Sequence, residues 1–140
     1  MSTIAKIEDA MLAALRAALP GVEVDTLPGP PEEAARRTMR MPAVWVIFRS
    51  RTFKGPEFFE DTAPEAEYSF FVLVLSRNLR SAKEGARGAY EVLDSVHSAL
   101  DGLQYQDGEF WPANEQLLDC EAGLFVYEIT YKISLKEGIA

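Results

Sequence analysis

The sequence has few of the residues on which most enzyme active sites depend. Its 140 residues include one cysteine, Cys120, and one histidine, His97. A single cysteine excludes an internal disulfide, and a single histidine excludes a histidine-rich metal site. A Gly-rich phosphate loop in a strand-turn-helix context is also missing. We therefore expect Cys120 to be a buried thiol in a strand, and His97 to have a structural or incidental place in a helix.

Long apolar runs are absent as well. No run reaches the length of a membrane span, and the first residues lack the basic-then-apolar layout of a signal peptide. The composition, 48% hydrophobic and 26% charged, is ordinary for a globular protein. A chain of this length is expected to form a single domain over residues 1–140, made in the cytoplasm and without a membrane partner.

Two long stretches of the sequence each lack charged residues of one sign. No Lys or Arg lies between Gly88 and Tyr131, where nine acidic residues fall, and no acid lies between Ala34 and Pro56. The net charge of −8 argues against general binding to nucleic acid. If the fold keeps the two blocks apart, the protomer is electrically two-sided and suits head-to-tail contacts. Chance clustering on a solvated surface is the alternative.

The sequence predicts two helices and one central strand as the main elements of the fold. Tyr68–Ser76 is apolar on both faces, which is typical of a central strand. Ser81 and Glu84 form a capping box for a helix that Gly102 closes. A first helix is expected from Ser2 or Thr3 to about Leu19.

Three more strands complete the expected sheet. Val22–Thr26 is a short strand with one wet face, and Ala43–Phe48 is apolar throughout. Leu124–Leu135 alternates between apolar and polar residues, which indicates a half-buried antiparallel strand. The fold class is therefore α+β: a single domain with a mainly antiparallel sheet, two helices packed on one face and a protruding loop or hairpin arm.

The remaining segments are predicted to be less regular. Leu27–Pro42 is a proline-broken connector, and Arg49–Ala66 is an excursion from the sheet, in the form of a hairpin arm. Phenylalanines in this arm either cap the rim of the core or anchor a neighbouring chain. Leu103–Asp119 reads as irregular, with Trp111 as its anchor onto the core and a short strand at Gln116–Cys120.

The sequence also leaves open one enzymatic alternative. Asp101, Asp107 and Glu109 are carboxylates close in sequence, and three such groups suit a divalent cation. A small metal-dependent hydrolase would use them. They match no known loop spacing, so we expect no catalytic residue, no cofactor and no metal site.

Four parts of the sequence carry a resemblance to a known family. They are Ile4–Ala10, Pro42–Val46, Ser76–Arg80 with the residues Arg87, Gly88, Tyr90, Leu93 and Leu100 that follow, and Tyr127–Tyr131. Together these segments resemble a family of small proteins encoded among the contractile-tail genes of Mu-like phages and prophages. The resemblance implies a tail terminator, which caps the tail tube as a hexameric ring, ends tube and sheath growth and offers a surface for joining the head. Neck and tail-completion adaptors share similar folds.

The resemblance also implies partners and a place of action. The partners are further copies of the chain, the tail tube protein, the sheath protein and a head–tail connector or neck protein, with no specific nucleic acid. The place is the tail or neck of a virion assembled in the bacterial host cytoplasm. Combined with the charge pattern, this gives a hypothetical interface made of Arg36, Arg37, Arg40, Arg49, Arg51, Lys54, Phe58, Phe59, Arg77 and Arg80.

Overall fold

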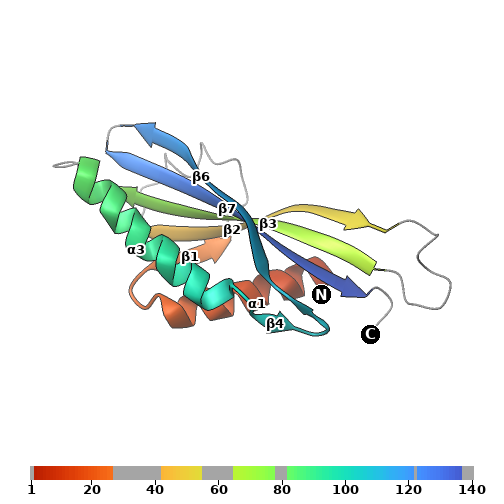
Figure 1. The fold of residues 1–140 in the computed structure, drawn as a ribbon. Helices are drawn as coiled ribbons and strands as arrows, with labels where there is room; N and C mark the ends of the chain where they lie inside the picture. Colours follow the sequence, from red (N-terminus) through yellow and green to blue (C-terminus); the bar gives the residue numbers. More distant parts are fainter. Residues whose placement is uncertain (1, 27–41, 55–64, 78–81, 122, 137–140) are drawn as a thin grey trace.

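A computed structural model describes residues 2–26, 42–54, 65–77, 82–121 and 123–136, with only the backbone for residues 82 and 84–86. The elements are α1 (Thr3–Ala18), β1 (Glu23–Thr26), β2 (Ala43–Phe53), β3 (Glu65–Arg77), α3 (Ala82–Leu100), β4 (Gln104–Tyr105), β5 (Gly108–Glu109), β6 (Trp111–Glu121) and β7 (Leu124–Lys136). The predicted α+β class is confirmed (Figure 1).

The main sheet has the strand order β1-β2-β3-β7-β6, with β3 at its centre. All its pairs are antiparallel except β1 with β2, which run parallel. The prediction of a central strand at β3 is confirmed. Its even-numbered residues, such as Phe70 and Val72, join the main core, while Leu73 and Leu75 join a second cluster on the other face.

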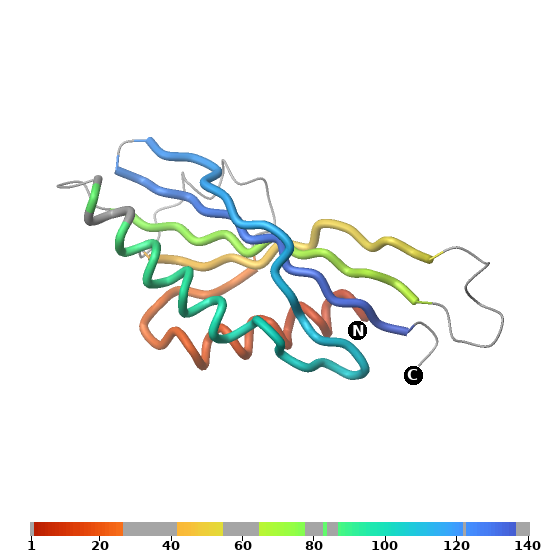
Figure 2. The backbone as a smooth tube through the Cα atoms, in the orientation of Figure 1, coloured from red at the N-terminus to blue at the C-terminus, as the bar shows by residue number. Residues whose placement is uncertain are grey.

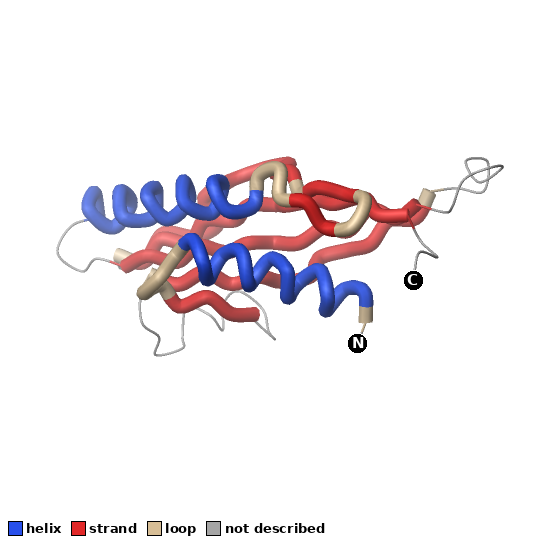
Figure 3. Tube along the Cα trace, turned by 90° about the horizontal axis from the view of Figure 1, so that it is seen from below, coloured by secondary structure: helices blue, strands red, loops and turns tan. Residues whose placement is uncertain are grey.

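Both helices lie on the same face of this sheet, as predicted (Figure 3). Ser2 begins α1, because its hydroxyl accepts a 3.0 Å hydrogen bond from the backbone N–H of Ala5. Ile7, Met11 and Leu15 of α1 are fully buried against the sheet. No helix among the described residues is long and apolar enough to cross a membrane.

Strand β7 follows the alternation read from the sequence. Ile129, Tyr131 and Ile133 are fully buried in the core beneath the helices. Glu128, Thr130 and Lys132 lie along a groove on the opposite face, which we call the open face. Glu128 and Thr130 are nonetheless buried, and Leu124 and Val126 on the same side of β7 belong to the second buried cluster. The strand predicted to be half-buried is therefore buried on both faces over most of its length.

The prediction for the arm needs one correction. Arg49–Phe53 does not leave the sheet but continues β2, paired with β3 as far as Phe53 and Ala66. We call Arg49–Lys54 the arm strand. With the facing part of β3 it extends beyond both helices (Figures 2 and 3). The expected turn of the hairpin at Asp61–Pro64 lies outside the described residues.

The largest error concerns Leu103–Asp119, which is mostly regular. It contains the β4–β5 hairpin and most of β6, an edge strand of 11 residues paired with β7. Phe110, fully buried, is the anchor of this segment, whereas the predicted anchor Trp111 is 38% exposed. Trp111 faces solvent because it begins the edge strand, and Phe110 lies just before it, in the turn onto the core.

Cys120 was also placed wrongly. It lies in β6 and is exposed rather than buried. A strand at the edge of a sheet has no neighbour on one side, so a thiol there stays in contact with solvent even though its strand is regular. Gly102 does end α3 as predicted, with a φ of 77° in the region that glycine tolerates best.

Candidate assembly interface

The predicted interface residues fall into three groups. Arg49, Arg51 and Lys54 lie together on the arm strand. Arg77 ends β3, at the opposite end of a 13-residue strand. At about 3.3 Å per residue, the two ends of β3 are about 40 Å apart. The other residues, Arg36, Arg37, Arg40, Phe58, Phe59 and Arg80, lie outside the described part of the chain. The structure therefore joins the arm cations with one another and does not join Arg77 to them.

A β-bulge shapes the start of the arm strand. Phe48 pairs with Phe70 and Ser50 with Ser69, so Arg49 is the extra residue between them. Bulges re-aim side chains and increase the twist of a strand. The Arg49 guanidinium lies 5.4 Å from the centroid of the Phe71 ring on the open face. This cation–π contact holds the side chain over the sheet.

Arg51 lies on the other side of the same strand. Its guanidinium is 5.0 Å from the ring centroid of Phe53 and 5.6 Å from that of Tyr68. Phe53 is 60% exposed, the most exposed of the large hydrophobic side chains in the described chain. Lys54 lies 3.9 Å from a carboxylate oxygen of Glu65. Cations and an exposed aromatic ring on a projecting strand are residue types that protein interfaces favour.

Arg49 also borders a groove of about 450 Å³ on the open face. The groove crosses four strands and is lined by Arg49, Phe71, Ala113, Asn114, Gln116, Glu128, Thr130 and Lys132. Its charges are mixed, and Gln116 donates a 3.2 Å hydrogen bond to the Glu128 carboxylate inside it. The groove offers a polar, curved surface to a partner rather than a deep apolar site for a small molecule.

Sequence reasoning found the far edge of the sheet only in part, because it predicted a strand at Gln116–Cys120 and not the whole of β6. All 11 residues of β6 are exposed, including the large apolar side chains of Trp111, Leu117 and Leu118. No strand borders β6 on its outer side within the described residues. A signal in the sequence was the set of acidic residues Glu115, Asp119 and Glu121, because charged side chains commonly protect edge strands.

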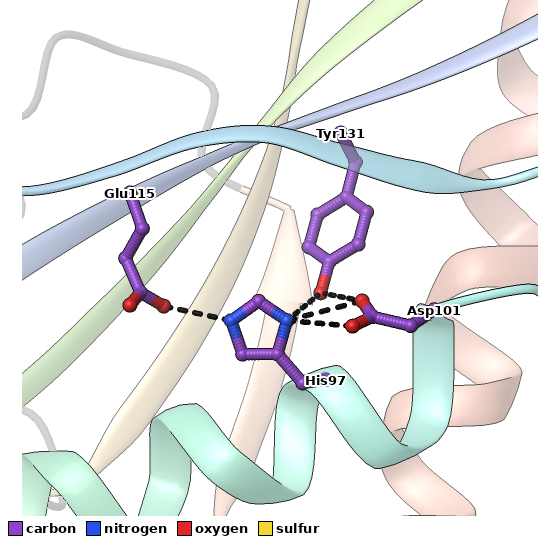
Figure 4. Close-up of polar contacts among 4 residues, drawn as sticks. All are labelled: His97, Asp101, Glu115 and Tyr131. Carbon is purple, nitrogen blue, oxygen red and sulfur yellow. Dashed lines mark hydrogen bonds and ion pairs between the residues drawn. The ribbon is translucent and has the colours of Figure 1, made fainter.

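One cluster of titratable side chains links α3 to β6 and β7. His97 Nδ1 lies 2.9 Å from an Asp101 oxygen, and His97 Nε2 lies 2.8 Å from a Glu115 oxygen (Figure 4). The Tyr131 hydroxyl donates a 2.7 Å hydrogen bond to Asp101. Ionised carboxylates only accept hydrogen bonds, so two carboxylates around one imidazole favour its doubly protonated form, in which both ring nitrogens donate.

The pKa values follow from this geometry. Burial alone would lower the pKa of His97, but its hydrogen bonds and charge interactions with Glu115 and Asp101 outweigh burial, and the pKa is raised. Burial, together with the hydrogen bond to Asp101, also raises the pKa of Tyr131. A cationic histidine and a neutral tyrosine form a structural clamp rather than a base and a nucleophile.

The carboxylates proposed for metal binding do not converge. Asp101 is engaged by His97 and Tyr131, Asp107 accepts a hydrogen bond from the backbone N–H of Lys136, and Glu109 accepts one from Gln104. In the part of the chain that the structure describes, no group of three His, Cys, Asp or Glu side chains could hold a metal ion. The positions of these carboxylates therefore give no support to the hypothesis of a metal-dependent hydrolase.

The fold and these surfaces define a small α+β domain with a projecting basic strand, a polar open face and an exposed acidic edge. A family model described as Gp37 protein matches residues 11–135, and the chain belongs to this family. No curated protein matches the sequence.

Among solved structures, the chain is similar to one in the virion of a native gene transfer agent particle. The identity is 15% and the TM-score 0.61, over 97% of this chain and 99% of the other. At this identity the match shows that the two chains share a fold over nearly their whole lengths.

Proposed function

We propose that this chain is a structural protein of a phage or phage-tail-like particle. The observation that carries the proposal is the end-to-end likeness in fold to a virion chain, together with membership of the Gp37 family. The arm strand and the β6 edge also support the proposal, because both are exposed surfaces that another protein chain can contact.

Within that class, the specific role is that of a tail terminator. Copies of the chain form a ring, hexameric in this proposal, on the last ring of the tail tube. The ring ends tube and sheath growth because its upper face does not pair with another tube subunit, and it offers that face to a connector or neck protein. Each protomer contact can be modest, since a ring repeats it several times.

The arm strand and the acidic edge would supply the contacts. The cations of the arm strand meet acidic surface on the next copy or on the tube end, and Phe53 adds an exposed apolar side chain beside them. Charge complementarity of this kind speeds encounter and fixes which surfaces meet. The protein acts in the tail or neck of a virion assembled in the bacterial host cytoplasm.

A neck or tail-completion adaptor of the same fold is the alternative within the class. An adaptor joins parts that are already finished, whereas a terminator also limits tube length. Tube length therefore separates the two roles.

The test is tube assembly from purified tail tube protein with and without this chain. We expect the chain to bind one end of each tube, visible by negative-stain electron microscopy, and to stop its elongation when more tube protein is added. Tubes that bind the chain at an end but keep growing would indicate an adaptor. Tubes that neither bind the chain nor change in length would contradict the proposed function.

A further inference from the structure

Two stretches of backbone at opposite edges of the main sheet lack a neighbouring strand within the described residues. At one edge, β1 pairs only with Ala43–Val46, so Ile47–Phe53 of β2 is open on its outer side. At the other edge, β6 is open along its whole length. Unpaired N–H and C=O groups along a strand are a ready template for pairing with another chain.

The two open edges carry opposite charges. The arm strand has Arg49, Arg51 and Lys54 and no acid, whereas β6 has Glu115, Asp119 and Glu121 and no base. Glu115 is engaged by His97, but Asp119 and Glu121 make no ion pair with any described residue. Arg49 and Arg51 likewise contact only aromatic rings in the described chain. Opposite charges on facing strands stabilise a pair, and like charges destabilise it.

The regular parts of the two edges are also similar in length. Beyond the Arg49 bulge, the arm strand keeps regular pairing over Ser50–Phe53. In β6, irregularities after Pro112 and after Leu117 leave Asn114–Leu117 as the regular run between them. Each regular run has four residues, so the two runs can pair with each other along their whole length. Exposed Phe53, Leu117 and Leu118 lie within or beside these runs and would lose contact with water.

Strand direction agrees with such a pairing in a ring. Strands β2, β3, β7 and β6 alternate in direction, because each neighbouring pair is antiparallel. In a ring whose axis runs roughly along the strands, β6 of one copy meets β2 of the next copy running the opposite way. The alternation then continues across the boundary, and the new pair is antiparallel. Within one copy, Asn114–Leu117 lies about five residues from Ser50–Phe53 along the strands, so this pairing staggers neighbouring copies. A ring accommodates the stagger when the strands tilt relative to its axis, as they do in closed barrels.

We propose that the β6 edge of one copy pairs with the open Ser50–Phe53 edge of a second copy, so that the sheet continues from protomer to protomer. The inference deepens the proposed function, since it names the contact by which copies form the ring. A two-fold pairing of β6 with another β6 is disfavoured, because it sets acidic side chains against acidic side chains.

Charge-reversal variants test the partners of this pairing. The arm variant carries Arg49→Glu and Arg51→Glu, and the edge variant carries Asp119→Lys and Glu121→Lys. Their controls make the same charge changes on exposed residues of α3: Lys83→Glu with Arg87→Glu, and Glu91→Lys with Asp94→Lys. Thermal unfolding of each variant confirms that it folds, and sedimentation velocity measures association.

We expect each interface variant alone to associate at least about tenfold more weakly than the wild type, while the controls associate like the wild type. An equimolar mixture of the arm and edge variants should regain association. In that mixture the acidic arm of one variant meets the basic edge of the other, and the two unreversed surfaces also remain complementary. An arm variant that associates normally while the edge variant does not would indicate β6–β6 pairing and overturn the inference.

Hydrogen exchange then tests whether the contact is made by backbone as well as by charge. Amides in Ser50–Phe53 and Asn114–Leu117 should exchange more slowly in the wild-type assembly than in dissociated protomers. Association without this protection, or equal association of all variants, overturns the strand pairing but leaves the proposed terminator role intact. A wild-type chain that assembles with this protection but leaves tubes untouched contradicts the proposed function alone. A wild-type chain that never associates contradicts both.

Discussion

His97 shows how a single residue can tie a helix to an edge strand. Its two ring nitrogens lie 2.9 Å and 2.8 Å from carboxylate oxygens of Asp101 and Glu115. Asp101 belongs to the end of the helical segment and Glu115 to β6, so the imidazolium bridges two elements that share few apolar contacts. Backbone pairing with β7 holds β6 in the sheet, and the bridge adds a side-chain contact to a strand whose residues are all exposed.

This bridge predicts a pH dependence of stability. The pKa of His97 is raised in the folded protein, so its contribution is fully present below the ordinary value of 6.5 and is lost as the pH rises through the folded value. We expect His97→Gln to remove about 1 kcal/mol of the free energy of unfolding at pH about 5.5 and to have a smaller effect at pH about 8.5. Urea unfolding at both pH values measures this. An equal loss at both would show that the charge of His97 is not what stabilises the fold.

A glycine is required at position 108 because residues of β7 lie close to its backbone, and not because of a positive φ. A Cβ at this position would fall on the backbone carbonyl oxygen of Ser134 and 2.9 Å from Ile133 Cγ1. We expect Gly108→Ala to lower the free energy of unfolding by about 2–3 kcal/mol, as overpacking against backbone does. Gly102→Ala is the comparison: its φ is 77° but nothing lies within 4 Å, so only about 1 kcal/mol of backbone strain is expected. Chemical denaturation of both variants measures the difference, and a Gly108→Ala loss no larger than that of Gly102→Ala would contradict the close packing.

At the scale of elements, the β4–β5 hairpin is anchored by Phe110. Its backbone N–H donates to the Leu103 carbonyl at 2.9 Å, and its carbonyl accepts from the Gly102 N–H at 2.8 Å. The ring is fully buried, whereas the next residue, Trp111, is 38% exposed. Phe110 and Trp111 are thus adjacent aromatic residues, one buried in the core and the other exposed to solvent.

We therefore expect Phe110→Ala to cost about 3–5 kcal/mol of stability and Trp111→Ala to cost less than about 1 kcal/mol. Thermal and urea unfolding of the two variants under one set of conditions measures both values. A larger loss for Trp111→Ala than for Phe110→Ala would mean that the indole, and not the phenyl ring, lies against the core in solution.

The elements that could be predicted are those whose burial follows a regular period. Helix α1, strand β3 and strand β7 each bury a stripe or face, so the apolar pattern gave their type and most of their extent. Strand β6 has no buried face, and irregular pairing near Ala113 and Leu118 interrupts its alternation. Its regularity comes from backbone pairing with β7, which leaves no apolar pattern to read.

The arm strand was hard to predict for a related reason. Beyond Phe48 its side chains are mostly exposed, and the bulge at Arg49 shifts the alternation by one residue. The cations Arg49, Arg51 and Lys54 do lie together as the charge pattern indicated. The acidic edge opposite them could not be located from sequence, because that required knowing which strand ends the sheet.

At the scale of the whole molecule, the described charges are arranged across the sheet from one edge to the other. The arm cations lie at the β2 edge, and Asp119 and Glu121 lie at the β6 edge three strands away. The chain nevertheless has a net charge of −8, so copies repel one another at long range unless these edges face each other.

This arrangement predicts how association responds to salt. Attraction between complementary exposed charges is screened over about 8 Å at physiological ionic strength and over less at higher salt. We expect the association constant to fall several-fold between about 0.05 M and 0.5 M NaCl, measured by sedimentation velocity. Association that strengthens with salt would show that the charged contact does not dominate. Screening of the net repulsion, or an apolar contact centred on side chains such as Leu117 and Leu118, would then outweigh it.

The central claim is that this protein works by binding copies of itself side by side. Its most direct test is the mass of the wild-type chain, measured by mass photometry and native mass spectrometry over a range of concentrations, alone and with tail tubes. The account predicts one closed species with a fixed number of copies, six in the proposal, either free or at tube ends. A chain that remains a monomer at every concentration and on tubes would contradict it.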